Sequence, residues 1–135
     1  MTFEIYRNRV NNFLNTLLTG QNALNESMRY SVLAGGKRFR PILTYTTANL
    51  FDVELSQVDA CSAAVELIHI YSLIHDDLPA MDDDDMRHNQ PSSHKIFGEA
   101  QAILVGDGLQ ALAFKVLAGA ENIKPSARIK LLNLL

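Results

Sequence analysis

Six aspartates fall within the ten positions from 76 to 85, beginning with the run Asp76-Asp77-Leu78-Pro79-Ala80-Met81-Asp82. Two ionised carboxylates about 5 Å apart repel each other by roughly 3 kcal/mol at an effective dielectric constant near 20. Asp76 and Asp77 also end an apolar, helix-like segment, where the helix dipole disfavours negative charge. A hard cation such as Mg²⁺ relieves this repulsion and keeps coordination positions open for phosphate oxygens. The pattern therefore predicts a magnesium site at Asp76, Asp77 and Asp82.

The acidic run has two other interpretations. A calcium-binding loop would alternate its ligands in an Asp-x-Asp-x-Asp-Gly order with a distal glutamate. The contiguous aspartates Asp82 to Asp85 lack both the alternation and the glycine, which disfavours calcium. Asp83 to Asp85 taken alone also fit an ordinary solvated loop, so the metal prediction depends mainly on Asp76 and Asp77.

A basic segment, Gly35-Gly36-Lys37-Arg38-Phe39-Arg40-Pro41, lies upstream of the acidic run. Its three cations precede or open a helix, where free N–H groups and the dipole favour an anion, and arginine binds phosphate through two nitrogens. A basic turn before a helix is common, so this signal is weak by itself. Together, the acidic and basic sites suit two diphosphates held in different ways. His69, two turns before Asp76, either adds a third type of contact or is a core histidine.

The elements that must position these groups are helical, because the hydrophobic periodicity is helical throughout and no period-two strand is evident. We therefore predict an all-α fold. The expected helices span residues 3–18, 22–34, 41–50, 58–78, 99–118 and 125–135. Gly35-Gly36 suits a left-handed turn after the second helix, and Pro79 should end the fourth near Leu78. Residues 82–91 are expected to be a loop.

The segment 58–78 is apolar over most of its circumference, which is typical of a buried helix. Its polar residues step by three or four along one face; they include Asp59, Ser62, Glu66, His69 and Asp76. This stripe should face a partner helix or a water-filled cavity. In the segment 99–118, Gly106 and Gly108 should allow a neighbouring helix to approach closely.

The composition fits one ordinary folded domain: the 135 residues are 47% apolar and 20% charged. The net charge of −3 gives no basic footprint for nucleic acid. Cys61 is the single cysteine, which excludes an internal disulfide framework and fits a reducing compartment. No signal-peptide pattern or 18-residue apolar run is evident, so we expect a cytoplasmic protein without a membrane span.

Three segments resemble the trans-isoprenyl diphosphate synthases, most closely the bacterial farnesyl (geranyl) diphosphate synthases. They are GGKRFRP (35–41), AAVELIHIYSLIHDDLPAMDDDD (63–85) and KIFGEAQAILVGDGLQALAF (95–114). Together they cover most of residues 28–118 in the order and spacing of that family. The four residues between Asp77 and Asp82 resemble the bacterial short-chain form of the family's first aspartate-rich motif.

The resemblance implies an all-α fold around a central cavity, usually a homodimer, and condensation of isopentenyl diphosphate with an allylic diphosphate such as dimethylallyl or geranyl diphosphate. It implies that Asp76, Asp77 and Asp82 hold the Mg²⁺ that binds the allylic diphosphate, which Arg87 also contacts. The residues implied for isopentenyl diphosphate are Lys37, Arg40, His69 and His88. Tyr71 and Ser72 would influence product length, and an aromatic at Tyr71 favours a C15 (farnesyl) product.

Two departures from the family pattern stand out. The family's Arg-Arg-Gly reads Arg87-His88-Asn89 here, and neutral imidazole cannot reproduce the forked donors of arginine. The chain also lacks a second aspartate-rich motif, so residues 1–135 are expected to form one incomplete domain with little activity by itself. A non-catalytic remnant or partner subunit that binds diphosphate or another synthase chain is the alternative, and an unrelated helical metal-binding module is a third possibility.

Overall fold

The computed structural model describes residues 2–135 and confirms the all-α prediction. The described residues contain seven α-helices, one 3-10 turn and one two-stranded hairpin. In chain order they are α1 (Thr2–Leu17), α2 (Ala23–Val32), α3 (Phe39–Leu50), η1 (Leu55–Gln57), α4 (Asp59–Asp76), β1 (Met86–Arg87), β2 (Gln90–Pro91), α5 (Ser93–Phe97), α6 (Glu99–Ala118) and α7 (Pro125–Leu134).

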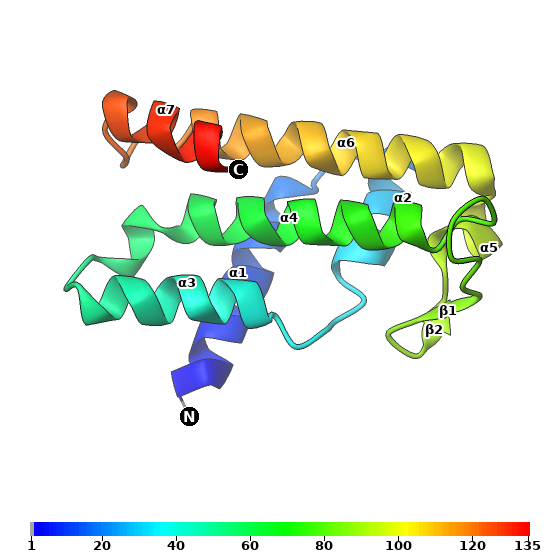
Figure 1. Ribbon diagram of the computed structural model, residues 1–135, viewed down its shortest axis with the longest axis horizontal. Helices are drawn as coiled ribbons and strands as arrows, with labels where there is room; N and C mark the ends of the chain where they lie inside the picture. Colours follow the sequence, from blue (N-terminus) through cyan, green and yellow to red (C-terminus); the bar gives the residue numbers. More distant parts are fainter. Residues whose placement is uncertain (1) are drawn as a thin grey trace.

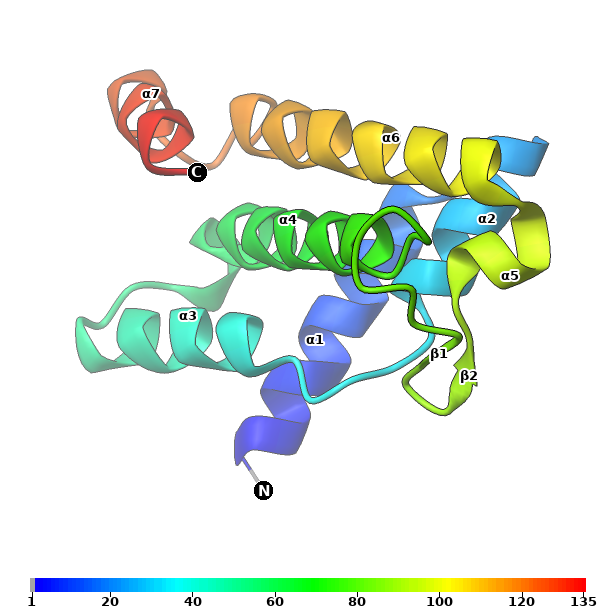
Figure 2. The ribbon, with the colours of Figure 1, turned by 45° about the vertical axis from the view of Figure 1, so that its right-hand side comes forward.

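Helix α4 is the centre of the fold. Figures 1 and 2 show α3, α4 and α6 side by side, with α4 antiparallel to both neighbours. Helix α1 crosses α3 and α4 on one side, α2 packs against α4 and α6, and α7 follows the C-terminal end of α6. The core between these helices is apolar and includes Val10, Leu14, Tyr45, Ala63, Leu67, Val105 and Leu109.

The helices that flank the basic segment and the acidic run start or end slightly away from their predicted bounds. Helix α3 begins at Phe39 rather than Pro41, since proline lacks only an N–H that the first helical turn leaves unbonded anyway. Helix α4 ends at Asp76 rather than near Leu78, because Pro79 restricts the residue before it. Gly35 and Gly36 have φ of 99° and 110°, which confirms the left-handed turn predicted between α2 and α3.

The loop predicted over 82–91 contains a short hairpin that the sequence did not reveal. Strands β1 and β2 pair antiparallel, with Arg87 opposite Gln90. The two residues between them, His88 and Asn89, both have positive φ, as the favoured two-residue hairpin turn requires. Strands of two residues carry no alternation of apolar and polar side chains, so hydrophobic periodicity could not detect them.

Glycines on α6 bring it close to two other helices, as predicted. A Cβ at Gly106 would lie 2.1 Å from the ring of His75 on α4, and one at Gly108 would lie 2.2 Å from Met28 on α2. The His75 ring also lies 3.1 Å from the carbonyl oxygen of Ile103. By length and composition alone, α6 is the one described helix that could cross a bilayer; here it packs along α4 as part of the core.

Part of the polar stripe on α4 faces partner helices, which was one of the two predicted alternatives. Asp59 accepts hydrogen bonds from Arg9 Nε at 2.6 Å and Nη2 at 2.7 Å. Tyr45 donates its hydroxyl to the same carboxylate, and burial together with this bond raises the pKa of Tyr45. The three side chains thus join α1, α3 and α4 through a part-buried polar cluster.

Candidate functional site

The backbone folds the acidic run back onto the end of α4. Asp77 and Leu78 continue the last turn through bonds to Leu73 and His75. The chain then reverses, and the Asp82 N–H donates to the carbonyl oxygen of Asp76 at 2.8 Å. This bond satisfies a carbonyl that the helix end would otherwise leave free, and it brings the first and last aspartates of the predicted metal site together.

Asp77 is held differently from the other two predicted metal ligands. Its residue is only 2% exposed, and its carboxylate accepts two hydrogen bonds from the guanidinium of Arg87, one of them from Nε at 3.2 Å. The bond to Asp77 raises the pKa of Arg87 and keeps it charged. Asp84 lies 3.5 Å from the same guanidinium. In this arrangement Asp77 fixes Arg87 at the hairpin rather than presenting free oxygens.

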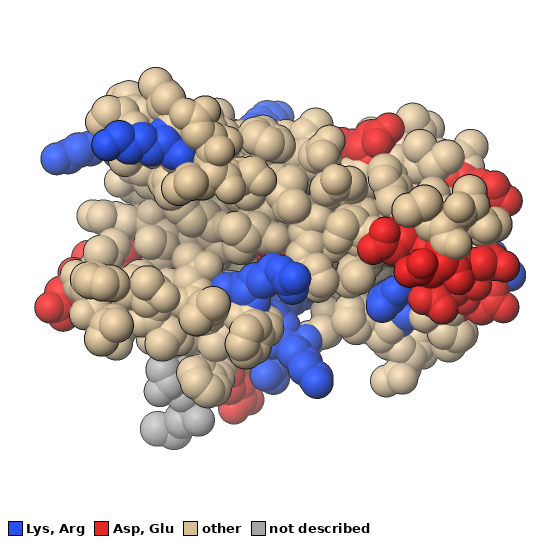
Figure 3. All heavy atoms as spheres, in the orientation of Figure 1, with Lys and Arg blue, Asp and Glu red and all other residues tan. Residues whose placement is uncertain are grey.

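Asp76 and Asp82 are the aspartates of the predicted site whose carboxylates have no ion pair or hydrogen bond among the described residues. Asp76 is half-buried and Asp82 is exposed. Two free carboxylates joined by a backbone bond form a hard oxygen donor set, which fits Mg²⁺ with water or phosphate completing its shell. Figure 3 shows a dense patch of acidic atoms over the loop that follows α4.

The basic segment and the hairpin enclose a cationic pocket of about 550 Å³. The structure brings together in it all four residues that the resemblance implies for isopentenyl diphosphate. They are Lys37, Arg40, His69 and His88. Lys37 and Arg40 are exposed, so their charges are free to meet an anion. In Figure 3 basic atoms gather around the N-terminal end of α3.

Arg38 does not belong with the other cations of the basic segment, because its side chain points into the protein. The residue is 4% exposed and has φ of 51°. Its guanidinium donates to Glu66 Oε1 at 3.0 Å, to the carbonyl oxygen of Val32 at 2.5 Å and to Asn11 at 2.9 Å. Arg38 therefore anchors the turn that presents Lys37 and Arg40, a role that sequence reasoning missed.

His69 lies on α4 at the wall of the cationic pocket. Burial lowers the pKa of His69, and the nearby positive charge of Arg40 lowers it further. The ring is therefore neutral near pH 7 in the free protein. A bound anion beside the ring would favour its charged form and so raise the pKa of His69. His69 can therefore bind a proton when a phosphate group binds.

Gly36 permits the contact between the basic turn and the hairpin. A Cβ at this position would lie 3.3 Å from the ring of His88, and the φ of 110° is one that side chains rarely adopt. Glycine thus lets the His88 ring close the cationic pocket from the hairpin side. His88 itself has φ of 52°, a conformation that histidine tolerates better than most residues.

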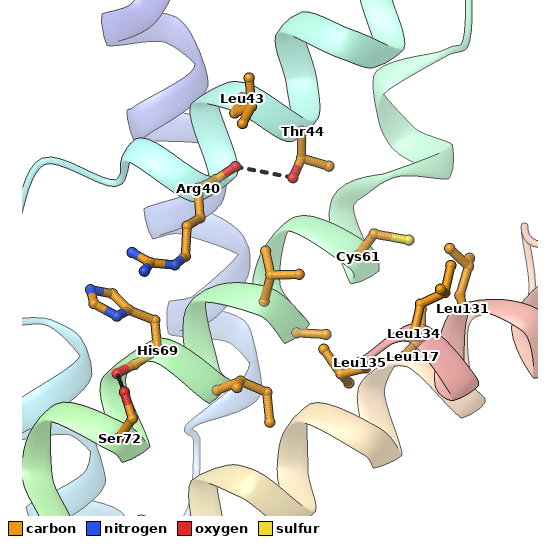
Figure 4. A pocket seen from close by; sticks show the side chains of 13 residues that line it. Arg40, Leu43, Thr44, Cys61, His69, Ser72, Leu117, Leu131, Leu134 and Leu135 are labelled. Atoms are coloured by element: carbon orange, nitrogen blue, oxygen red, sulfur yellow. Dashed lines mark hydrogen bonds between the residues drawn. The ribbon is translucent and has the colours of Figure 1, made fainter.

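An apolar groove of about 510 Å³ begins where the cationic pocket ends. Arg40 and His69 line both, and Figure 4 shows them side by side at one end, with Cys61 and Leu131 at the other. Ser72 lines the groove, whereas Tyr71 does not and packs edge-on against His75 with ring centroids 5.5 Å apart. The groove and the pocket together suit a ligand with an anionic head and a hydrocarbon tail.

These features define a predominantly helical protein with an acidic loop and with a cationic pocket that continues into an apolar groove. Comparison with known families agrees: the family model for polyprenyl synthetase matches residues 21–135. This chain belongs to the polyprenyl synthetase family.

Its relatives include farnesyl diphosphate synthases. That of Escherichia coli (strain K12) is 57% identical over 103 residues, covering 76% of this chain and 34% of the relative. That of Haemophilus influenzae is 46% identical over 131 residues, covering 94% of this chain and 44% of the relative. The crystal structure of a geranyltransferase from Legionella pneumophila superposes with a TM-score of 0.93 at 43% identity, covering 98% of this chain and 48% of that one. The chain thus spans between a third and a half of the length of these relatives.

Proposed function

We propose that this chain provides the diphosphate-binding part of a prenyltransferase that joins isopentenyl diphosphate to an allylic diphosphate, dimethylallyl or geranyl diphosphate. The observation that carries the proposal is the continuity of the cationic pocket with the apolar groove at Arg40 and His69. A prenyl diphosphate has the same division into a charged head and an apolar tail. The names of the relatives, farnesyl diphosphate synthase and geranyltransferase, support this substrate class.

In this proposal the isopentenyl diphosphate head occupies the cationic pocket. Lys37 and Arg40 bind its phosphate oxygens, and His69 and His88 complete the pocket on the sides of α4 and the hairpin. The Arg38–Glu66 pair holds the turn in place beneath them. Because no metal is needed for these contacts, binding in this pocket should not depend on Mg²⁺.

The allylic diphosphate is assigned to the acidic loop. Asp76 and Asp82 would hold Mg²⁺, with Asp77 acting mainly through its bonds to Arg87, which is turned toward the same loop. Bound Mg²⁺ supplies positive charge that stabilises the leaving diphosphate. The residues of the chain orient the substrate and keep Arg87 protonated beside it, which adds a second fixed positive charge.

The product length, the quaternary structure and the cellular location are proposed as follows. We propose a short product near C15, for which the half-buried aromatic ring of Tyr71 and its neighbour Ser72 are the candidate determinants. We propose a homodimer through the exposed apolar residues of α6, Ile103, Leu104 and Phe114, and a cytoplasmic location. Light scattering tests the dimer against the 15.0 kDa mass of one chain.

Calorimetric titration tests the two binding assignments separately. Isopentenyl diphosphate should bind without metal, and Lys37→Ala or Arg40→Ala should weaken it roughly tenfold. Geranyl diphosphate should bind more tightly with Mg²⁺, and Asp76→Ala should remove that dependence. Lys115→Ala, which removes an exposed lysine near the far end of α6, is the matched control and should change neither. Binding that is equally weakened by Lys115→Ala contradicts the proposal.

A turnover assay tests the expectation that residues 1–135 have little activity by themselves. Mg²⁺, isopentenyl diphosphate and geranyl diphosphate are incubated with the chain, and products are separated by chromatography. We expect both ligands to bind with little or no farnesyl diphosphate formed. Robust farnesyl diphosphate that disappears in Asp76→Ala would contradict this expectation, and it would also contradict the alternative of a remnant or partner subunit that binds diphosphates but does not join them.

A further inference from the structure

His94 is a buried histidine with no partner for either ring nitrogen. The residue is 7% exposed, and both Nδ1 and Nε2 are shielded from solvent without a hydrogen bond to any described residue. Buried polar atoms are nearly always bonded, because burial removes the water that would otherwise satisfy them. The ring of His94 therefore requires a group that the protein itself does not supply.

Two carboxylates lie in front of this ring. One ring nitrogen of His94 and one oxygen each of Asp83 and Asp85 all lie within 4.8 Å of one another. Both aspartates are exposed. Asp83 has φ of 54°, and its N–H donates to the carbonyl oxygen of Leu78, which fixes its place after the end of α4.

We propose that Asp83, Asp85 and His94 bind a divalent transition-metal ion such as Zn²⁺ or Mn²⁺, at a site distinct from the one formed by Asp76 and Asp82. One imidazole and two carboxylates suit these ions, whereas Mg²⁺ prefers oxygen ligands alone. Donor atoms within 4.8 Å of one another need to move closer together to form bonds of about 2.0–2.2 Å to one ion. Water completes the coordination.

Lys95 competes with the ion for one of the ligands. Its Nζ lies 2.8 Å from Asp85 Oδ1, and its side chain is partly exposed. A metal ion must displace the ammonium from that oxygen or use the other one. Removal of the lysine should therefore tighten metal binding and leave all three ligands intact, whereas removal of a ligand should weaken it.

The site would clamp the hairpin that carries Arg87. Asp83 and Asp85 precede β1, and His94 follows β2. The Ser92 N–H already donates to the carbonyl oxygen of Asp85 at 2.9 Å, which closes the base of the hairpin. A metal ion bound at this base would join its two ends a second time and restrict its motion.

Titration of the full chain with Co²⁺, followed by visible absorption, and with Zn²⁺, followed by calorimetry, tests the site. His94→Gln, Asp83→Asn and Asp85→Asn should each weaken binding roughly tenfold or more, and His94→Gln should change the Co²⁺ spectrum. Asp84→Asn and Asp76→Asn are the controls: each removes a neighbouring carboxylate outside the cluster and should leave this binding event in place. Lys95→Gln should tighten it severalfold.

A second measurement does not depend on variants that could fail to fold. Amide hydrogen exchange of the unmodified chain should slow at Met86 to Gln90 when Zn²⁺ is added. Binding that survives His94→Gln unchanged, or that Asp84→Asn weakens as much as Asp83→Asn, overturns the proposal. The absence of both binding and exchange protection at about 1 mM Zn²⁺ also overturns it and assigns the His94 ring to an ordered water.

Discussion

Arg87, on the hairpin, donates two hydrogen bonds to the buried carboxylate of Asp77 at the end of α4. The pair joins the acidic loop to the hairpin, and only Arg87 is open to solvent, with about a third of its side chain exposed. The second aspartate of the acidic run thus has a structural partner of its own. Replacing Asp77 should therefore change the stability of the fold differently from replacing Asp76.

Replacing Asp77 by asparagine should destabilise the fold by about 1–3 kcal/mol, because the change removes a charged acceptor that is almost fully buried. Asp76→Asn should change stability by less than about 0.5 kcal/mol and in the stabilising direction, since it removes negative charge at a helix C-terminus. Urea unfolding at neutral pH measures both. If both variants lose the same free energy of unfolding, the bond between Asp77 and Arg87 does not contribute the expected stability.

Replacing Glu66 by alanine should cost about 3–5 kcal/mol, because it leaves Arg38 buried without its carboxylate. The double variant Arg38→Met, Glu66→Leu should recover much of this loss by replacing the ion pair with apolar contacts. Thermal unfolding compares the three proteins. The double variant should nevertheless bind isopentenyl diphosphate weakly, since the turn that presents Lys37 loses its anchor. Stability and binding that fall together in every variant would argue against a separate anchoring role.

Binding of a diphosphate should be accompanied by proton uptake at His69. Burial and Arg40 lower the pKa of His69 in the free protein, so the unfolded chain binds more protons there and stability falls as the pH drops below about 6.5. A bound anion reverses this preference and raises the pKa. Calorimetry near pH 6 in two buffers of different ionisation enthalpy should therefore show uptake, and His69→Gln should reduce it. Proton uptake that is unchanged in His69→Gln would contradict this prediction.

Replacing His88 by arginine should tighten the binding of isopentenyl diphosphate about tenfold. Arginine is always charged and offers forked donors, whereas a neutral imidazole offers one. Calorimetry tests this, with Asn49→Arg, an exposed position near the opposite end of α3, as a control for added charge. An unchanged affinity would place His88 outside the contact set.

The sequence was most informative where structure is local. The helical periodicity and the turn at Gly35-Gly36 depend on neighbouring residues and were predicted correctly. The small residue at Gly106 indicated that another helix approaches α6 there, but the sequence did not identify His75 on α4 as the partner. The local spacing also predicted a metal site at Asp76, Asp77 and Asp82, without distinguishing one aspartate from another. The separation of Asp77 from Asp76 and Asp82 depends on Arg87, whose position depends on the undetected hairpin.

Groups whose roles depend on distant contacts were missed. Arg38 has the same side chain as Arg40 and lies two positions before it, yet it turns inward to reach Glu66 on another helix. His94 has no motif of its own, and only its burial beside Asp83 and Asp85 draws attention to it. A histidine close to several aspartates in the sequence was the signal available, and it is a weak one.

The contact of His88 with Gly36 has a consequence for how the two anion sites arise during folding. The acidic loop closes through Asp82 and Asp76, which lie a few positions apart, so it can form as soon as α4 does. The cationic pocket needs α3, α4 and the hairpin to have docked, because its walls come from remote segments. A partly folded chain would therefore acquire its affinity for metal ions before it acquires a metal-independent affinity for diphosphate.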